Sequence, residues 1–163
     1  MKTLITLLLL ASASLAQKPD QPEEMRVFKL DIVVRELEGG KVLNLRTFSL
    51  SLAQSNPNNN ASLRTGDKIP VPSGKDGQFT FLDVGTNIDC HFLQMRGNDL
   101  MLQVTADVSS IAPVPNLPMP MVTQTRWNAP VIVPLRKPTI VLASEGASGK
   151  RQMQLEITAT PLQ

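Results

Sequence analysis

The sequence predicts an all-β fold, namely an antiparallel β-sandwich or open barrel of about eight strands. Apolar and polar residues alternate with a period of two over many short segments, which is typical of half-buried strands. Turn-forming clusters of Gly, Asn, Pro and Asp separate these segments, and no segment beyond residue 16 has a helical period. The predicted strands are a hairpin at residues 25–52, then strands at 62–71, 78–95, 100–109, 122–133, 139–143 and 151–160.

The hairpin at 25–52 contains the first clear alternation, with one apolar face formed by Phe28, Leu30, Ile32 and Val34. Its turn at 38–41 contains two glycines, which can adopt positive φ without strain. In its second strand the apolar positions change face near Leu43 and Leu45, which indicates a β-bulge.

Two later segments also have a defined place in the predicted sheets. Pro70 and Pro72 lack the N–H donor that a central strand needs, so we expect their segment at a sheet edge or a strand end. The strand at 151–160 alternates without a break, and its apolar face consists of Met153, Leu155, Ile157 and Ala159.

Residues 1–16 have the three parts of a secretory signal. Lys2 supplies the positive region, residues 4–10 are apolar, and small residues precede a cleavage site expected after Ala16. The apolar stretch is shorter than the roughly 20 residues that span a bilayer, which favours cleavage over a membrane anchor. We expect a flexible leader at 17–24 and a single β domain at 25–163.

Export sets the expected location of the mature chain. The periplasm is the expected compartment, with the outer membrane or the extracellular medium as alternatives, and no stable membrane span is expected after cleavage. The 16 basic and 14 acidic residues are scattered, so no basic patch indicates nucleic-acid binding.

Cys90 is the only cysteine, so an intrachain disulfide is impossible. Ile88 and Phe92 share its strand face, which predicts a buried and inert thiol. Pairing with a cysteine of another chain is the alternative.

The residues that most often carry catalysis are few. His91 is the only histidine and, as the neighbour of Cys90, points to the other face of the strand, so the two cannot form a nucleophile–base pair. A catalytic triad or a typical zinc site would also need further partners. We therefore predict that the protein is not an enzyme, with no catalytic, cofactor-binding or metal-binding residues and no cofactor.

A calcium site is the open alternative, because four carboxylates lie on two neighbouring strands and their turn. They lack the tight spacing of a calcium loop, and the polar faces of half-exposed strands explain them more simply. These carboxylates are Asp83, Asp89, Asp99 and Asp107.

Four segments follow one another in an order that resembles the conserved β domain of bacterial secretins. They are Ser62–Pro72 with its Gly-x-x-x-Pro pattern, the Asp-Val-Gly strand 81–90, the strand 102–111 with Val-Ser-Ser, and Thr125–Arg126. Secretins form the outer-membrane channels of type II and III secretion and type IV pilus systems. The resemblance covers about residues 62–143, and it implies a secretin-like β topology and a role in the cell envelope.

Two departures separate the sequence from that pattern. The glycine-rich hairpin near the end of the secretin domain corresponds here to residues 136–144, which contain no glycine. The hairpin at 25–52 also stands where secretins carry repeated periplasmic modules. We therefore expect a stand-alone soluble module rather than a complete channel.

Three functions are compatible with this sequence. The first is a non-enzymatic structural or protein-binding component of secretion or pilus machinery, with a protein partner or self-association. The second is a small secretin-like protein that assembles in the outer membrane, although Trp127 and five phenylalanines are few for aromatic girdles. The third, least favoured, is a metal-dependent hydrolase.

Overall fold

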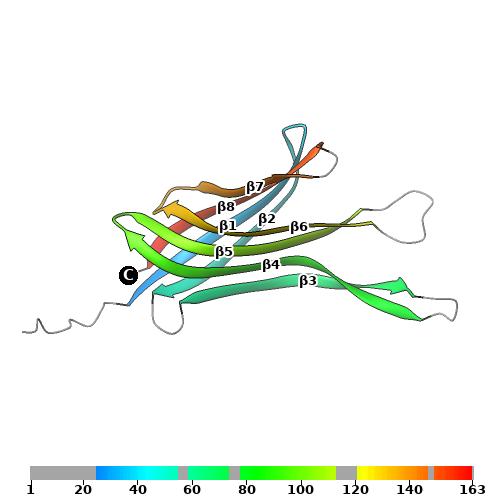
Figure 1. Ribbon diagram of the computed structural model, residues 1–163, viewed down its shortest axis with the longest axis horizontal. Helices are drawn as coiled ribbons and strands as arrows, with labels where there is room; N and C mark the ends of the chain where they lie inside the picture. Colours follow the sequence, from blue (N-terminus) through cyan, green and yellow to red (C-terminus); the bar gives the residue numbers. More distant parts are fainter. Residues whose placement is uncertain (1–24, 55–58, 74–77, 113–120, 147–148, 163) are drawn as a thin grey trace, which may run out of the picture.

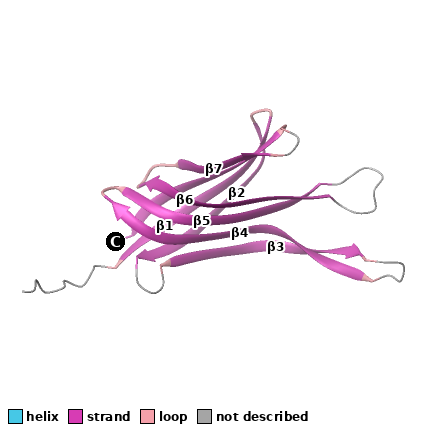
Figure 2. Ribbon diagram, viewed as in Figure 1, coloured by secondary structure: helices cyan, strands magenta, loops and turns pink. Residues whose placement is uncertain are grey.

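The computed structural model describes residues 25–54, 59–73, 78–112, 121–146 and 149–162. The signal expected at 1–16 and the leader expected at 17–24 lie outside the described residues. Within the described residues the chain forms strands joined by turns and loops, without a helix (Figure 2). The strands are β1 Arg26–Glu38, β2 Lys41–Gln54, β3 Asn60–Pro72, β4 Phe79–Arg96, β5 Asp99–Ala112, β6 Met121–Pro134, β7 Thr139–Glu145 and β8 Arg151–Leu162.

The strands form two four-stranded antiparallel sheets that pack face to face (Figure 1). One sheet has the order β2-β1-β8-β7 and the other has the order β3-β4-β5-β6. Between the sheets lies one apolar core, to which the alternate residues of β1, β4, β5 and β8 contribute. The predicted all-β sandwich is confirmed.

Alternation in the sequence places the right residues in that core. Leu30 and Ile32 of β1 and Leu155 and Ile157 of β8 are fully buried, while the residues between them point outward. Fully burying such a side chain contributes roughly 1.5–3 kcal/mol, so the register of these two central strands is strongly specified.

A β-bulge interrupts the β1–β2 ladder near its turn. Glu36 pairs with Asn44 but the next residue, Leu37, pairs with Val42, so Leu43 is the extra residue. The bulge expected near Leu43 and Leu45 is confirmed. Beyond it the exposed edge of β2 carries Val42, Leu43 and Leu45, each about half exposed.

Candidate functional site: an open-edged sheet and its uncovered half

The sheet β3-β4-β5-β6 ends in two long strands that have no hydrogen-bonded neighbour on their outer side among the described residues. β3 has 13 residues and β6 has 14. The position of Pro70 and Pro72 on β3 confirms the edge predicted for that segment. Pro130 and Pro134 fit the β6 edge for the same reason.

Two glycines face each other where β3 and β4 leave the sandwich. Gly66 pairs directly with Gly85, and a Cβ on Gly66 would come within 2.5 Å of the Val84 carbonyl oxygen. A Cβ on Gly85 would overlap the carbonyl oxygen of Thr65. The two strands therefore approach each other here more closely than any other residue type allows.

The same position is a branch point in the sheet. The β4–β5 ladder ends at the pair Thr86–Val108, so Gly85 has no backbone partner on β5. Ser109 replaces that partner, because the Gly85 N–H donates to its Oγ at 2.8 Å and the hydroxyl lies 3.4 Å from the Gly85 carbonyl oxygen. Past this point β3 and β4 continue as a two-stranded ribbon, while β5 and β6 continue separately (Figure 1).

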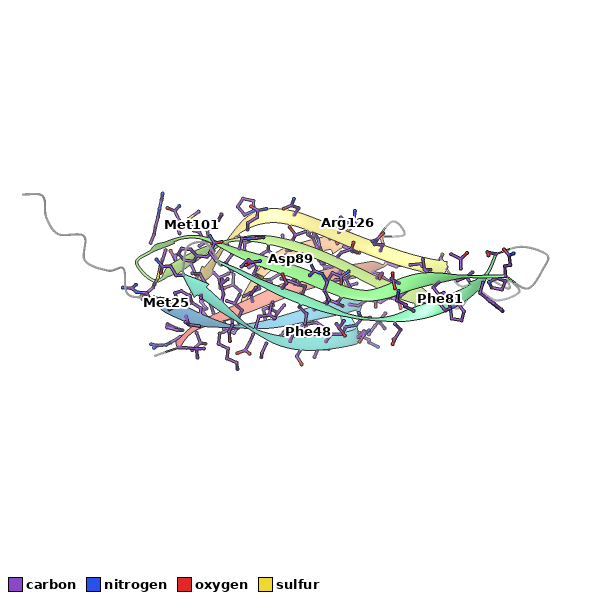
Figure 3. All side chains as sticks on the ribbon, turned by 90° about the horizontal axis from the view of Figure 1, so that it is seen from below. Met25, Phe48, Phe81, Asp89, Met101 and Arg126 are labelled. Carbon is purple, nitrogen blue, oxygen red and sulfur yellow. The ribbon has the colours of Figure 1, made fainter. Side chains whose placement is uncertain are left out.

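We call Gly66–Pro72 and Phe79–Gly85 the distal ribbon. Phe79 and Phe81 are 60% and 62% exposed, and Pro72 and Pro70 are their cross-strand partners on the same face. Within the ribbon, Lys68 and Asp83 form an ion pair at 3.4 Å, and the residues beyond them, 69–72 and 79–82, carry no charge. In Figure 3, Phe81 lies at the end of the molecule opposite Met25 and Met101.

We call the part of this sheet that packs against the other sheet, residues 86–92 in β4, its covered half. Its outer face is polar, and ion pairs there link neighbouring strands. Arg64 of β3 contacts both carboxylate oxygens of Asp89 at 2.8 Å, and Ser62 donates to the same carboxylate at 2.7 Å. Partial burial alone would raise the pKa of Asp89, but the hydrogen bonds from Ser62 and Arg64 outweigh it and lower that pKa. Asp89 is therefore a structural anion on the strand beside the β3 edge.

The β6 edge has a matching pair. Arg126 contacts Asp107 of β5 through Nε at 3.0 Å and Nη2 at 2.7 Å, and Gln124 donates to the same carboxylate. Arg126 and Asp89 are labelled in Figure 3. On each edge strand an arginine side chain thus forms an ion pair with a carboxylate on the neighbouring inner strand.

A groove of about 640 Å³ lies where the two sheets diverge. Its walls come from β2 on one side and from β3, β4 and β5 on the other. Arg46 and Phe48 of β2 face residues 65–69 of β3 across it, and Ser109–Ile111 of β5 and the pair Glu36–Arg151 complete the lining. We call this space the intersheet groove.

The candidate catalytic and metal-binding residues from the sequence do not come together in one site. Cys90 is fully buried, and burial raises the pKa of its thiol to about 12, so it is an inert core residue as predicted. His91 is exposed on the opposite face of β4. Asp83 pairs with Lys68, and Asp99 is exposed at the start of β5.

No group of three or more His, Cys, Asp or Glu side chains is arranged to hold a metal ion in the part of the chain that the structure describes. The described residues also contain no helix long and apolar enough to cross a membrane. What the structure brings together is instead a pair of open edges, an apolar ribbon and a groove.

Sequence reasoning missed the intersheet groove and the role of Ser109. The signal that was available for the branch point is the pair of glycines, one in each strand of a predicted hairpin. The groove had no such signal, because its walls come from strands that are far apart in the sequence and belong to different sheets.

No protein-family model matches the chain, and no curated protein matches it by sequence. Solved structures match it by shape. The type II secretin GspD from enteropathogenic Escherichia coli superposes with a TM-score of 0.52 and 10% identity, over 85% of this chain and 66% of that one. GspD in the pilotin–secretin AspS–GspD complex of enterotoxigenic E. coli gives 0.50 and 10%, over 85% of this chain and 47% of that one.

A third match is the secretin domain of InvG from the Salmonella SPI-1 injectisome, with a TM-score of 0.49, 8% identity, and coverage of 85% and 61%. The chain thus spans between about half and two thirds of the secretin chains it matches. The matched 85% exceeds the half of the chain that carries the sequence motifs, so the likeness extends beyond residues 62–143. The predicted secretin-like topology is confirmed, and the described β domain has the fold of the secretin domain.

Proposed function

We propose that the protein is a non-enzymatic module of the bacterial cell envelope that binds protein through the open edges of its β3-β4-β5-β6 sheet, as a component associated with secretion or pilus machinery. The observation that carries the proposal is the combination of a secretin-domain fold with two long edge strands that have no outer neighbour among the described residues. Unpaired edge N–H and C=O groups are a template for strand addition by a partner.

The chemistry of the described residues supports a binding role over catalysis. The thiol of Cys90 is buried and its pKa is raised, and His91 lies on the opposite face of the same strand. The carboxylates of Asp89 and Asp107 form ion pairs with arginines. The similar solved structures are secretins, among them a type II secretin and a secretin in complex with a pilotin.

The test places a photoreactive amino acid at exposed edge positions, Ser62 on β3 and Thr123 on β6, in cells that export the protein. His91 is the matched control, since it is exposed on the same sheet but on the interior strand β4. We expect discrete crosslinked products from the two edge positions and none from position 91. Equal crosslinking at all three positions, or at none, overturns the edge-binding proposal.

Export is part of the same proposal, with cleavage after Ala16 and a final location in the periplasm. Intact-mass measurement of the protein recovered from the cell envelope tests it. A chain that begins at Gln17 is expected, and a chain that retains residues 1–16 contradicts the cleaved signal.

A second candidate is self-assembly in the outer membrane. It is favoured by one observation, namely that both edges of the same sheet are open in the part of the chain that the structure describes, so the β3 edge of one copy can pair with the β6 edge of the next. Such head-to-tail contacts close into rings or continue as filaments. Sedimentation of the protein with and without membranes decides: a defined ring that resists extraction supports this candidate, and a small soluble species supports the first.

A further inference from the structure

Arg46 is a cation on the inner face of the sandwich, at the mouth of the intersheet groove. It lies opposite Val34 on the β1–β2 ladder and is only partly exposed. Its guanidinium donates one hydrogen bond, from Nη1 to the hydroxyl of the buried Thr86 at 2.9 Å. A guanidinium has five N–H donors, so most of its bonding capacity is left for another partner.

Four other arginines are neutralised by carboxylates, whereas Arg46 is not; the remaining three, Arg26, Arg96 and Arg136, are exposed. Arg35, Arg64, Arg126 and Arg151 each contact a carboxylate within 3.2 Å, but none of the ion pairs among the described residues includes Arg46. A partly desolvated cation without a counter-charge is costly, and a carboxylate binding at the groove would offset that cost.

The groove has the dimensions and the lining of a site for an extended peptide. Its volume of about 640 Å³ is within the usual range of binding sites, roughly 300–1,000 Å³. Phe48, Ile69 and Ile111 supply apolar surface, and Asp67 on the β3 wall has no ion-pair partner among the described residues. One wall is the edge strand β2, whose outer main-chain groups are unpaired in the described sheet.

The chain itself contains a segment with complementary chemistry, namely the leader Gln-Lys-Pro-Asp-Gln-Pro-Glu-Glu at 17–24. It carries three carboxylates and one lysine, and its Pro-x-x-Pro spacing favours an extended conformation that loses little entropy on binding. The carboxylates suit Arg46, and Lys18 suits Asp67.

The leader cannot bring these carboxylates to Arg46 of its own chain. Arg26 begins β1 at the far end from the groove, and Val34, opposite Arg46, lies eight residues along, or about 26 Å. Asp20, Glu23 and Glu24 are six, three and two residues from Arg26, so even a fully extended leader carries them no more than about 20 Å from it. The inner face between the two points is filled by the buried side chains Phe28, Leu30 and Ile32.

We propose that the intersheet groove binds residues 17–24 of a second copy of the chain, with a leader carboxylate on the Arg46 guanidinium. The inference rests on the proposed export, which leaves the leader at the mature N-terminus. It differs from pairing through the β3 and β6 edges, because its central contact is with Arg46 of the β2 wall, while residues 65–69 of β3 form the facing wall of the same groove.

The experiment uses two variants of the mature chain, residues 17–163, in sedimentation velocity. The groove variant is Arg46→Gln, and the leader variant combines Asp20→Asn, Glu23→Gln and Glu24→Gln. The unchanged protein is expected to self-associate, and each variant alone is expected to do so about tenfold more weakly or worse. Arg96→Gln, at the exposed end of β4, is the matched control and should associate like the unchanged protein.

The decisive experiment mixes the groove variant with the leader variant. The groove variant still has an intact leader and the leader variant still has an intact groove, so the mixture should form a one-to-one complex that neither forms alone. Circular dichroism and thermal unfolding of each variant exclude loss of folding as the cause. A mixture that stays monomeric, or association that neither variant weakens, overturns the proposal and leaves the edge crosslinks of Ser62 and Thr123 unaffected.

Discussion

The two halves of the β3–β4 hairpin have the same strand pairing but opposite surroundings. From Thr86 to Phe92 the second sheet covers β4, and every second residue is buried. From Phe79 to Asp83 the same strand keeps its ladder with β3 but every residue is exposed. The ribbon is therefore formed by backbone pairing alone, whereas the side chains of β4 are buried only where the other sheet lies opposite.

Because it buries few side chains, we expect the uncovered half to contribute little to the free energy of unfolding. The covered half contains the core, and the distal ribbon past the branch point contributes surface that can meet a partner. This contrast makes predictions that run from a large loss of stability in the covered half to almost none in the distal ribbon.

The largest effect is expected from Leu102→Ala. Leu102 is fully buried in the covered half of β5, so the substitution leaves a cavity in the core. The free energy of unfolding should fall by about 2–5 kcal/mol. Urea denaturation of the mature chain measures it, and a loss below about 1 kcal/mol would mean that the sheets are not tightly packed there.

At the boundary between the halves, Gly85→Ala should cost about 1–3 kcal/mol, because the new methyl group overlaps the Thr65 carbonyl oxygen and forces the strands apart. Gly146→Ala is the matched control. Its Cβ would meet nothing closer than 3.4 Å, and we expect a change within about 0.5 kcal/mol. Equal effects in the two variants would contradict the close approach of β3 and β4.

On the outer face of the covered half, Asp89 should make stability depend on pH. Its pKa is lower in the folded chain than its ordinary value of 3.8, so the stabilisation is fully present above that value and is lost as the pH falls through the folded pKa. The stability difference between the unchanged protein and Asp89→Asn should therefore shrink from pH 6 to pH 2.

Unfolding in urea at a series of pH values measures this difference. Ser62→Ala removes one of the hydrogen bonds that lower the pKa and should give an intermediate dependence on pH. A difference that stays constant over the whole range would show that the Arg64 and Ser62 contacts do not persist in solution.

The smallest effect is expected from Phe81→Ser in the distal ribbon. Phe81 is 62% exposed, so the free energy of unfolding should change by no more than about 0.5 kcal/mol. The same urea experiment applies. A loss above about 1 kcal/mol would show that another part of the chain covers this residue, and the contrast between the two halves would then fail.

Most of the fold could be predicted because local chemistry specifies it. Alternation placed Leu30 and Ile157 on buried faces, Gly39 and Gly40 marked a turn in which both have positive φ, and Pro70 marked a sheet edge. The buried state of Cys90 followed from its neighbours at 88 and 92. These features depend on residues within a few positions of one another.

The candidate site depends on contacts that no local pattern reports. Ser109 replaces the missing partner of Gly85 from 24 residues away, and Arg46 meets Thr86 across 40 positions of sequence and two sheets. The strands, their faces and their turns follow from the amino-acid sequence alone, because a period of two and turn-forming residues act locally. The point where the sheets diverge depends on long-range packing, namely on how far one sheet covers the other. That packing leaves the distal ribbon exposed and the groove open.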